Sequence, residues 1–304
     1  IAGRQLFQAE APGPSEDRLT PRLRNTAGAV LAVYVGLTVA CLLSYLATGM
    51  GPFDALAHAL TTLAAGGFSP EARSFEAFGA GPQWVATVFM AFAGANFALQ
   101  YRAFTGRPRI LLADPEFRAY VAIALAAGVA LTLLLLPTYG VVEAPRHALF
   151  QSFSILTTTG YASLDFEAWG GRAQAVLVVL MIVGGSAGSA AGGIKVVRLL
   201  IALKNTAREV RHTLHPRAVL PVRVGRRVVP TEVLRAVTGF LTLYLMLMLA
   251  TTGVLIAFGS DHLTAVTASL VTLGNVGPGL GAVGPMDNYA HLAGPAKASL
   301  VFAM

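Results

Sequence analysis

The sequence predicts an all-α membrane protein made of tandem repeats, each a helix, a re-entrant pore half-helix and a second helix, around a central pore. Composition is the first reason: 55% of the 304 residues are hydrophobic and 12% are charged, outside the usage of soluble domains. The second is a series of charge-free stretches, each close to the ~20 residues that a spanning helix needs. The third is a glycine-bearing turn that recurs at residues 62–69, 156–162 and 273–279.

Five charge-free stretches predict spanning helices. They cover residues 27–48, 83–101, 119–136, 173–194 and 236–258, and a sixth begins near Leu292. The chain opens on Ile1 and ends on Met304 within an apolar run, so we expect a fragment of a longer protein. The single cysteine, Cys41, lies inside the first stretch and leaves no disulfide and no cysteine metal site to consider.

Residues 27–104 form the first predicted repeat. After the first helix, Pro52 and Asp54 open a half-helix over residues 55–63, because an acidic residue near a helix start interacts favourably with the helix dipole. The turn AGGFS follows, and a return helix begins at Gln83.

Two further repeats have the same plan. The second covers residues 119–203, with a half-helix over 146–156 and the turn TTTGY. The third covers residues 236–304, where Asp261 opens the half-helix and GNVGPG forms the turn.

Positive charge is concentrated on one side of the predicted helices. Most of the 22 Lys and Arg residues fall in residues 1–26, in the loop 105–118 with its flanks, or between Lys195 and Arg235. By the positive-inside rule, 1–26, 105–118 and the basic segment 204–235 are cytoplasmic, and all three glycine turns approach from outside. The net charge of +7 therefore reports topology, and no nucleic-acid partner is expected.

The three turns have the features of a cation filter. A half-helix of about ten residues covers ~15 Å, half of a ~30 Å hydrocarbon core, so it must re-enter. Irregular backbone at that depth is tolerated where it is enclosed by protein or lines a water-filled cavity, so the turns should converge on one axis. The helix C-termini then favour a cation, and glycine lets backbone carbonyls replace its hydration shell.

The predicted K⁺-binding residues are those at and just before the central glycines of the turns: Ala65, Gly66, Gly67, Thr158, Thr159, Gly160, Asn275, Val276 and Gly277. The alternative is that the turns are ordinary loops, where glycine and proline are frequent.

Residues 184–193 read GGSAGSAAGG and predict a break in the second return helix. Each glycine weakens a helix by roughly 1 kcal/mol relative to alanine. We expect a flexible loop that blocks or clears the pore, although a small-residue surface for helix packing is the alternative. Lys195 would add an electrostatic barrier or act as an interfacial anchor. The candidate gating residues are Gly184, Gly185, Ser186, Gly188, Ser189, Gly192, Gly193 and Lys195.

Other polar residues in the apolar segments predict packing contacts. His58 and His147 lie on half-helices, where hydrogen bonding within the repeat is favoured over metal binding. Asn96 and Gln100 lie four residues apart, which predicts hydrogen bonds between helices from one face of the return helix. No catalytic constellation, cofactor site or transition-metal site is predicted.

Several segments together resemble a known family. They are AHALTTLAAGGFS (57–69), LTTTGYA (156–162), GGSAGSAAGGIKVVR (184–198), HPRAVLPVRVGRRVVP (215–230) and LGNVGPGLG (273–281). In this order they resemble the Trk-type potassium-uptake subunits, TrkH-like members of the Trk/Ktr/HKT superfamily.

The resemblance implies four pore repeats in one chain, a homodimer in the bacterial inner membrane, and a cytosolic nucleotide-binding regulatory subunit of the TrkA type as partner. It implies that this chain holds three of the four repeats and lacks the first repeat and the end of the last helix.

The leading hypothesis is thus a potassium-translocating subunit with a carbonyl filter and an intramembrane gating loop. The alternatives are a Ktr-type Na⁺-dependent K⁺ transporter and a non-conducting membrane subunit that docks a cytosolic partner. A membrane-embedded enzyme ranks third.

Overall fold

The computed structural model describes residues 23–304 except 216, 219 and 226, and most of these residues are helical. The predicted cytoplasmic segment 1–26 lies outside the described residues as far as residue 22. The elements are α2 (Leu23–Ala47), α3 (Pro52–Leu63), η1 (Ser74–Ala77), α4 (Ala80–Ala93), α5 (Phe97–Phe104), α6 (Arg109–Ala113), α7 (Pro115–Leu156), η2 (Phe166–Ala168), α8 (Gly171–Val183), α9 (Val196–Leu214), β1 (Arg223–Val224), β2 (Arg227–Val228), α10 (Thr231–Ala257), α11 (His262–Gly274), η3 (Gly281–Val283), η4 (Tyr289–His291) and α12 (Gly294–Ala303).

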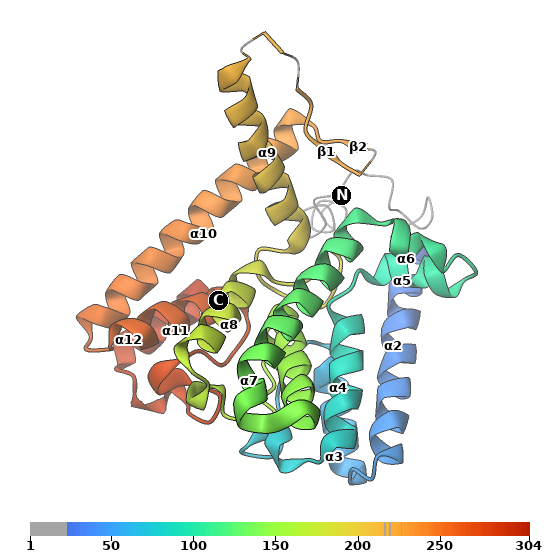
Figure 1. The fold of residues 1–304 in the computed structure, drawn as a ribbon, viewed down its shortest axis with the longest axis vertical. Helices are drawn as coiled ribbons and strands as arrows, with labels where there is room; N and C mark the ends of the chain where they lie inside the picture. The colour runs from blue at the N-terminus through green and yellow to red at the C-terminus, as the bar shows by residue number, and fades with distance from the viewer. Residues whose placement is uncertain (1–22, 216, 219, 226) are drawn as a thin grey trace.

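Among the described helices, α2, α7 and α10 are long and apolar enough to cross a membrane. The all-α membrane fold predicted from composition is therefore confirmed. Each of the three leads into a half-helix, which is α3, the second part of α7, and α11. The antiparallel pair β1–β2 is a hairpin of two-residue strands outside the bundle (Figure 1).

The second half-helix begins earlier than predicted. We expected a connection before Arg146, but α7 is interrupted only at Gly140, whose φ of 74° and ψ of 178° are not helical. Glycine adopts this positive φ at no steric cost. One residue therefore replaces the expected loop, and the chain turns sharply at the lower end of α7 (Figure 1).

The return helices of the first two repeats are both broken midway. The break between α8 and α9 was expected from the glycines after Val183. The break between α4 and α5 was not, because residues 83–101 were predicted as one continuous helix. Gly94 ends α4, and the Asn96 side chain caps α5 by accepting from the Leu99 amide at 2.9 Å. A glycine C-cap followed by an asparagine N-cap stops one helix and starts another.

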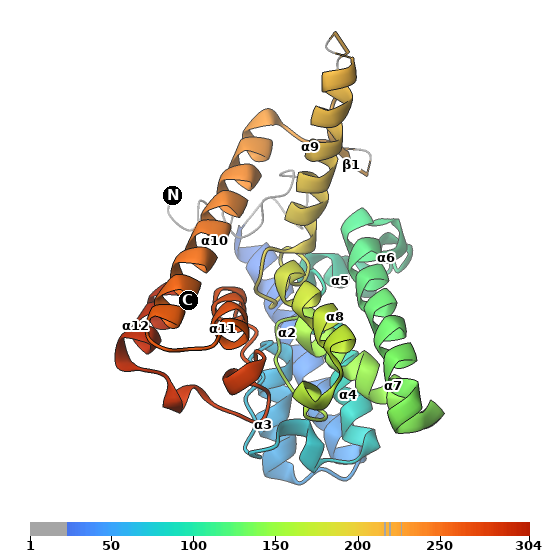
Figure 2. The same ribbon diagram turned by 60° about the vertical axis from the view of Figure 1, so that its left-hand side comes forward.

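The repeats pack through shared apolar clusters. The largest joins all three repeats, since it includes the fully buried rings of Tyr45, Phe75 and Phe150 and also Val271 of α11. In the third repeat α10, α11 and α12 pack on one another and lie beside α8 (Figure 2). Helix α9 projects beyond the bundle, and its base packs against the hairpin and α10 (Figure 1). The turns after the half-helices thus lie among all three repeats.

Candidate functional site

Three turns of different sequence share one backbone conformation. Each half-helix is followed by a residue in the left-handed region: φ is 52° at Ala65, 55° at Thr158 and 54° at Asn275. The next amide in each turn then donates to a carbonyl five residues earlier. These bonds run from Gly66 to Thr61, from Thr159 to Ser154 and from Val276 to Val271, at 2.8, 2.9 and 2.8 Å.

The sequence did not indicate these left-handed positions, because alanine and threonine disfavour them. Such conformations persist where the surrounding structure imposes them. The repeated strain makes these turns the candidate functional site of the fold.

The central glycines bring the turns into contact in series. Gly67, Gly160 and Gly277 have φ of 66°, 81° and 100°. A Cβ added at Gly67 would overlap the carbonyl oxygen of Thr159, and one added at Gly160 would overlap that of Val276. A Cβ at Gly277 would meet no described atom within 4 Å. The first turn therefore rests on the second and the second on the third, while the third is open on its far side.

The structure brings the predicted ion-binding residues together only in part. Thr159 and Val276 are almost fully buried, with their carbonyl oxygens at the contacts between turns. Asn275 and Gly277 are exposed at the open side of the series.

Hydroxyl groups hold the exit of each turn. Thr61 Oγ1 donates to the Phe68 carbonyl at 2.9 Å, and Ser154 Oγ donates to the Tyr161 carbonyl at 2.6 Å. Thr61 and Ser154 each lie six residues before a central glycine and bind the carbonyl one residue after it. In the third repeat Thr267 donates to the Leu280 carbonyl at 3.0 Å instead. Sequence reasoning missed these residues, although the shared spacing in the first two repeats was a usable signal.

The two half-helix histidines also hold the segments that leave the turns. His58 Nε2 lies 3.0 Å from Ser69 Oγ, and His147 Nδ1 lies 2.9 Å from Ser163 Oγ. The prediction of hydrogen bonding within the repeat is confirmed for both. Among the described residues, no group of three or more His, Cys, Asp or Glu side chains is placed to hold a metal ion.

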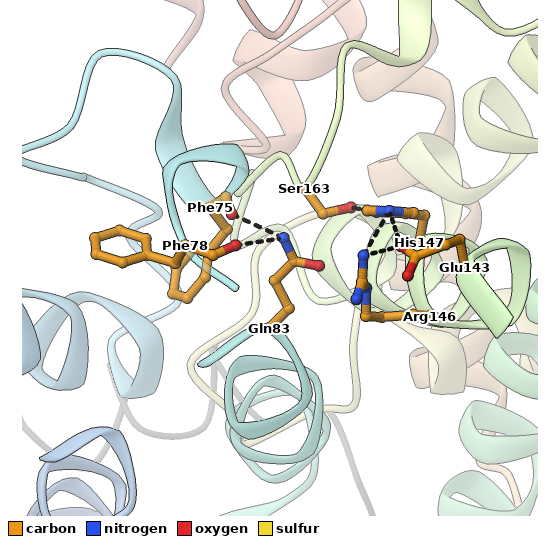
Figure 3. Close-up of polar contacts among 7 residues, drawn as sticks. All are labelled: Phe75, Phe78, Gln83, Glu143, Arg146, His147 and Ser163. Carbon is orange, nitrogen blue, oxygen red and sulfur yellow. Dashed lines mark hydrogen bonds and ion pairs between the residues drawn. The ribbon is translucent and has the colours of Figure 1, made fainter. Parts of the chain in front are cut away.

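Figure 3 shows the polar anchors around His147. Arg146 pairs with Glu143 and also lies 3.2 Å from the Nε2 of His147. From the first repeat, Gln83 Nε2 donates to two backbone carbonyls of the segment before α4, those of Phe75 at 2.9 Å and Phe78 at 3.0 Å. These contacts hold the segment before α4 and the segment after the second turn in place.

The segment between α8 and α9 lies directly against the turns. The Gly192 amide donates to Thr158 Oγ1 at 2.7 Å, and a Cβ at Gly192 would overlap the Gly274 carbonyl at the end of α11. All the predicted gating residues lie in this non-helical segment. Positive φ angles occur at Gly184, Gly188, Gly193 and Lys195, and Lys195 is the N-cap of α9.

The same segment is bonded to the break in the first return helix. The amides of Ser186 and Ala190 donate to the carbonyls of Gly94 and Ala93 at 2.9 and 3.1 Å. In the opposite direction, the Phe97 amide donates to the Gly188 carbonyl at 3.0 Å. The two broken helices therefore satisfy each other's backbone groups at the level of the turns.

Gln100 and Asn96 serve this break rather than a helix–helix face. Gln100 Nε2 donates to the carbonyls of Phe92 and Ala95, at 2.8 and 2.9 Å. Asn96 caps α5 and reaches the 184–195 segment. The predicted contacts from one face of a continuous helix are wrong, because Gln100 bonds back to the end of α4 and Asn96 begins α5.

Comparison with known proteins gives matches along the whole chain. The sequence profile of the TrkH family, described as cation transport protein, matches residues 1–304. The Trk system potassium uptake protein TrkH of Vibrio parahaemolyticus is 39% identical over 291 residues, covering 93% of this chain and 60% of that protein. The TrkH protein of Halomonas elongata is 38% identical over 310 residues, covering 100% of this chain and 64% of that protein.

The fold is also similar to a solved structure. The crystal structure of the potassium transporter TrkH from Vibrio parahaemolyticus superposes with a TM-score of 0.88 at 36% sequence identity, covering 98% of this chain and 65% of that one. The chain thus spans 60% to 65% of the length of these proteins.

Proposed function

Because the chain belongs to the TrkH family of cation transport proteins, we propose that it forms most of the ion pathway of a potassium uptake protein. The observation that carries this proposal is the series of contacts between three turns of identical backbone, from Gly67 to Thr159 and from Gly160 to Val276. Relatives named as potassium uptake proteins support K⁺ as the transported ion.

The proposed filter uses the backbone rather than the side chains. The turns differ at the left-handed position, which is alanine, threonine or asparagine, yet the chain follows the same path in each. Carbonyl oxygens of residues 65–67, 158–160 and 275–277 then replace the hydration shell of K⁺. The negative C-terminal ends of three half-helices meet there and favour a cation over an anion.

The non-helical segment 184–195 is the proposed gate. It contacts the second turn through Thr158 and the third turn through Gly274. An ion that leaves the turns on this side must pass the segment, so conduction requires the segment to move.

The proposed topology places the basic loops in the cytoplasm of a bacterium, with the turns opening outward across the inner membrane. The open side of Gly277 is the place for a fourth turn, supplied by sequence beyond these 304 residues. The relatives are named as parts of a Trk system, which supports the same role for this protein. Its expected partners are a second copy of the protein and a TrkA-type cytosolic nucleotide-binding subunit.

Reconstitution of the full-length protein into liposomes tests this function directly. We expect uptake of K⁺ and Rb⁺ to exceed that of Na⁺, and uptake to be lost in Gly160→Ala, whose added methyl group overlaps the Val276 carbonyl. Gly239→Ala is the matched control, since its methyl group meets nothing within 4 Å. K⁺ uptake that survives unchanged in both Gly160→Ala and Gly160→Arg would refute the filter assignment.

The same liposomes separate the alternatives. Uptake that requires an inward Na⁺ gradient would identify a Na⁺-dependent transporter. Retained binding of a cytosolic partner with no ion flux under any condition would identify a non-conducting subunit instead.

A further inference from the structure

Ala187, which lies within the proposed gate, is held by side chains from two other helices. We infer that Asn96 and Glu116 are positioning residues that latch the 184–195 segment against the turns, by binding both backbone polar groups of Ala187. The inference deepens the proposed gating function and rests on it.

The two bonds meet at one residue. The Ala187 amide donates to Glu116 Oε1 at 2.6 Å, and Asn96 Nδ2 donates to the Ala187 carbonyl at 2.7 Å. Glu116 lies in the first turn of α7, and Asn96 lies at the start of α5. Ala187 itself is 6% exposed. Its N–H and C=O are thus bonded to two different helices.

Glu116 binds the segment at two points. Its Oε1 accepts the short bond from the Ala187 amide, and the same side chain accepts from the backbone of Val197. It therefore links Ala187 to the start of α9.

Asn96 supplies the other half without giving up its role as a helix cap. Its Oδ1 accepts from the Leu99 amide while its Nδ2 binds Ala187. Gly188 makes room for this side chain, since a Cβ there would come within 2.9 Å of Nδ2, and its φ of +70° also suits glycine. The fit of Asn96 depends on a glycine within the gating segment.

Release of the segment requires both hydrogen bonds of Ala187 to be replaced. In a water-poor interior an unpaired amide or carbonyl is costly, so Ala187 must exchange both partners before the segment moves. A cavity of about 30 Å³ lined by Asn96, Arg102 and Glu116, among others, adjoins the latch. It is large enough for a water molecule to take over a released bond.

Hydrogen exchange on the full-length protein in liposomes tests the latch without relying on transport. The variants are Glu116→Ala, Glu116→Gln, Asn96→Ser and Asn96→Asp. Asn96→Asp keeps the cap oxygen and removes the donor to Ala187. Glu232→Ala is the matched control, because Glu232 lies in the first turn of α10 and is exposed.

We expect amides in 184–195 to exchange about tenfold faster in Glu116→Ala, with a smaller increase in Glu116→Gln, whose amide oxygen still accepts one bond. Asn96→Asp should speed exchange in the same peptide and leave the Leu99 amide protected. Basal K⁺ flux should rise alongside. Because both residues hold Ala187, the double variant Asn96→Ser/Glu116→Gln should fall short of the product of the two single effects.

The outcomes separate the latch from the proposed function. If exchange in 184–195 stays unchanged in all four variants, or rises equally in the α10 peptide, the latch is wrong, whatever the flux. If the unmodified protein carries no K⁺, the proposed function fails, and faster exchange without any gain in flux would overturn the link between latch and gate.

Discussion

The hydroxyl of Tyr161 lies 2.5 Å from Oγ1 of Thr61, joining the exit of the second turn to the half-helix of the first repeat. Thr61 in turn donates to the Phe68 carbonyl at the exit of the first turn. The Tyr161 ring is fully buried and packs against Phe75. The first two turns are thus coupled through side chains as well as through the contact between Gly67 and Thr159.

Tyr161→Phe should loosen this coupling with little change in packing. We expect a loss of about 1 kcal/mol in stability, since the short bond to Thr61 is removed together with longer contacts to Thr62 and the His58 carbonyl, while Thr61 keeps its carbonyl partner. Discrimination of K⁺ against Na⁺ should also fall, as measured by competition of Na⁺ with Rb⁺ uptake. Tyr34→Phe in α2 is the control, and equal selectivity in both variants would argue against a role for the Tyr161 hydroxyl.

Gly67→Ala and Gly277→Ala form a matched pair that tests for a fourth turn. Both glycines have a positive φ, which costs alanine roughly 1–2 kcal/mol. Only Gly67 faces a carbonyl oxygen among the described residues. In the full-length protein we expect the two changes to lower the melting temperature equally, because the proposed fourth turn places a carbonyl beside Gly277. A clearly milder effect of Gly277→Ala would mean that this side is unoccupied.

Gly192→Ala should displace the proposed gate. Its methyl group overlaps the Gly274 carbonyl, so the segment must move away from the third turn. We expect higher basal K⁺ flux in liposomes, whereas Gly36→Ala in α2, which meets nothing within 4 Å, should behave as the unmodified protein. Flux that stays at the basal level while the protein remains folded would contradict a gate at this position.

Asp261 should make the third half-helix sensitive to low pH. Hydrogen bonds from Thr264, from its hydroxyl and then its backbone amide, hold the pKa of Asp261 below its usual range. This stabilisation is complete above the pKa of an unfolded aspartate, about 3.9, and is lost as the pH falls through the lower folded value.

Loss of this N-cap in Asp261→Ala should reduce stability by about 1 kcal/mol at pH 7. The carboxylate is mostly exposed, so its charge adds little beyond the cap. Melting in detergent at pH 7 and below pH 3 checks this, since the difference from the unmodified protein should shrink at the lower pH. Asp261→Asn keeps a capping oxygen and should show a small difference at both values.

Apolar length, glycine turns and charge predicted the parts of the fold that depend on local sequence. The spanning stretches, the half-helices and the break after Val183 follow from apolar length and from glycines, which act within a few residues. The cap at Asp261 was readable for the same reason, since its side chain binds an amide only three residues away.

Features set by distant contacts were not readable. The α4–α5 break is stabilised by hydrogen bonds to the 184–195 segment. Gly94 and Asn96 alone therefore did not predict the break. The left-handed angles at Ala65 and Thr158 oppose residue preference and are imposed by packing. Ion binding at the turns remains a prediction for the flux measurements.

The contacts between turns also order the steps of folding. The first and second turns reach their final form only when a carbonyl of the following repeat rests against their glycines, Gly67 and Gly160. Contacts between residues far apart in sequence form late, because the loop entropy they require is lost first. The helices of all three repeats must therefore be inserted before the turns meet. The proposed ion pathway is then assembled last, so a partly inserted chain does not open the membrane to ions.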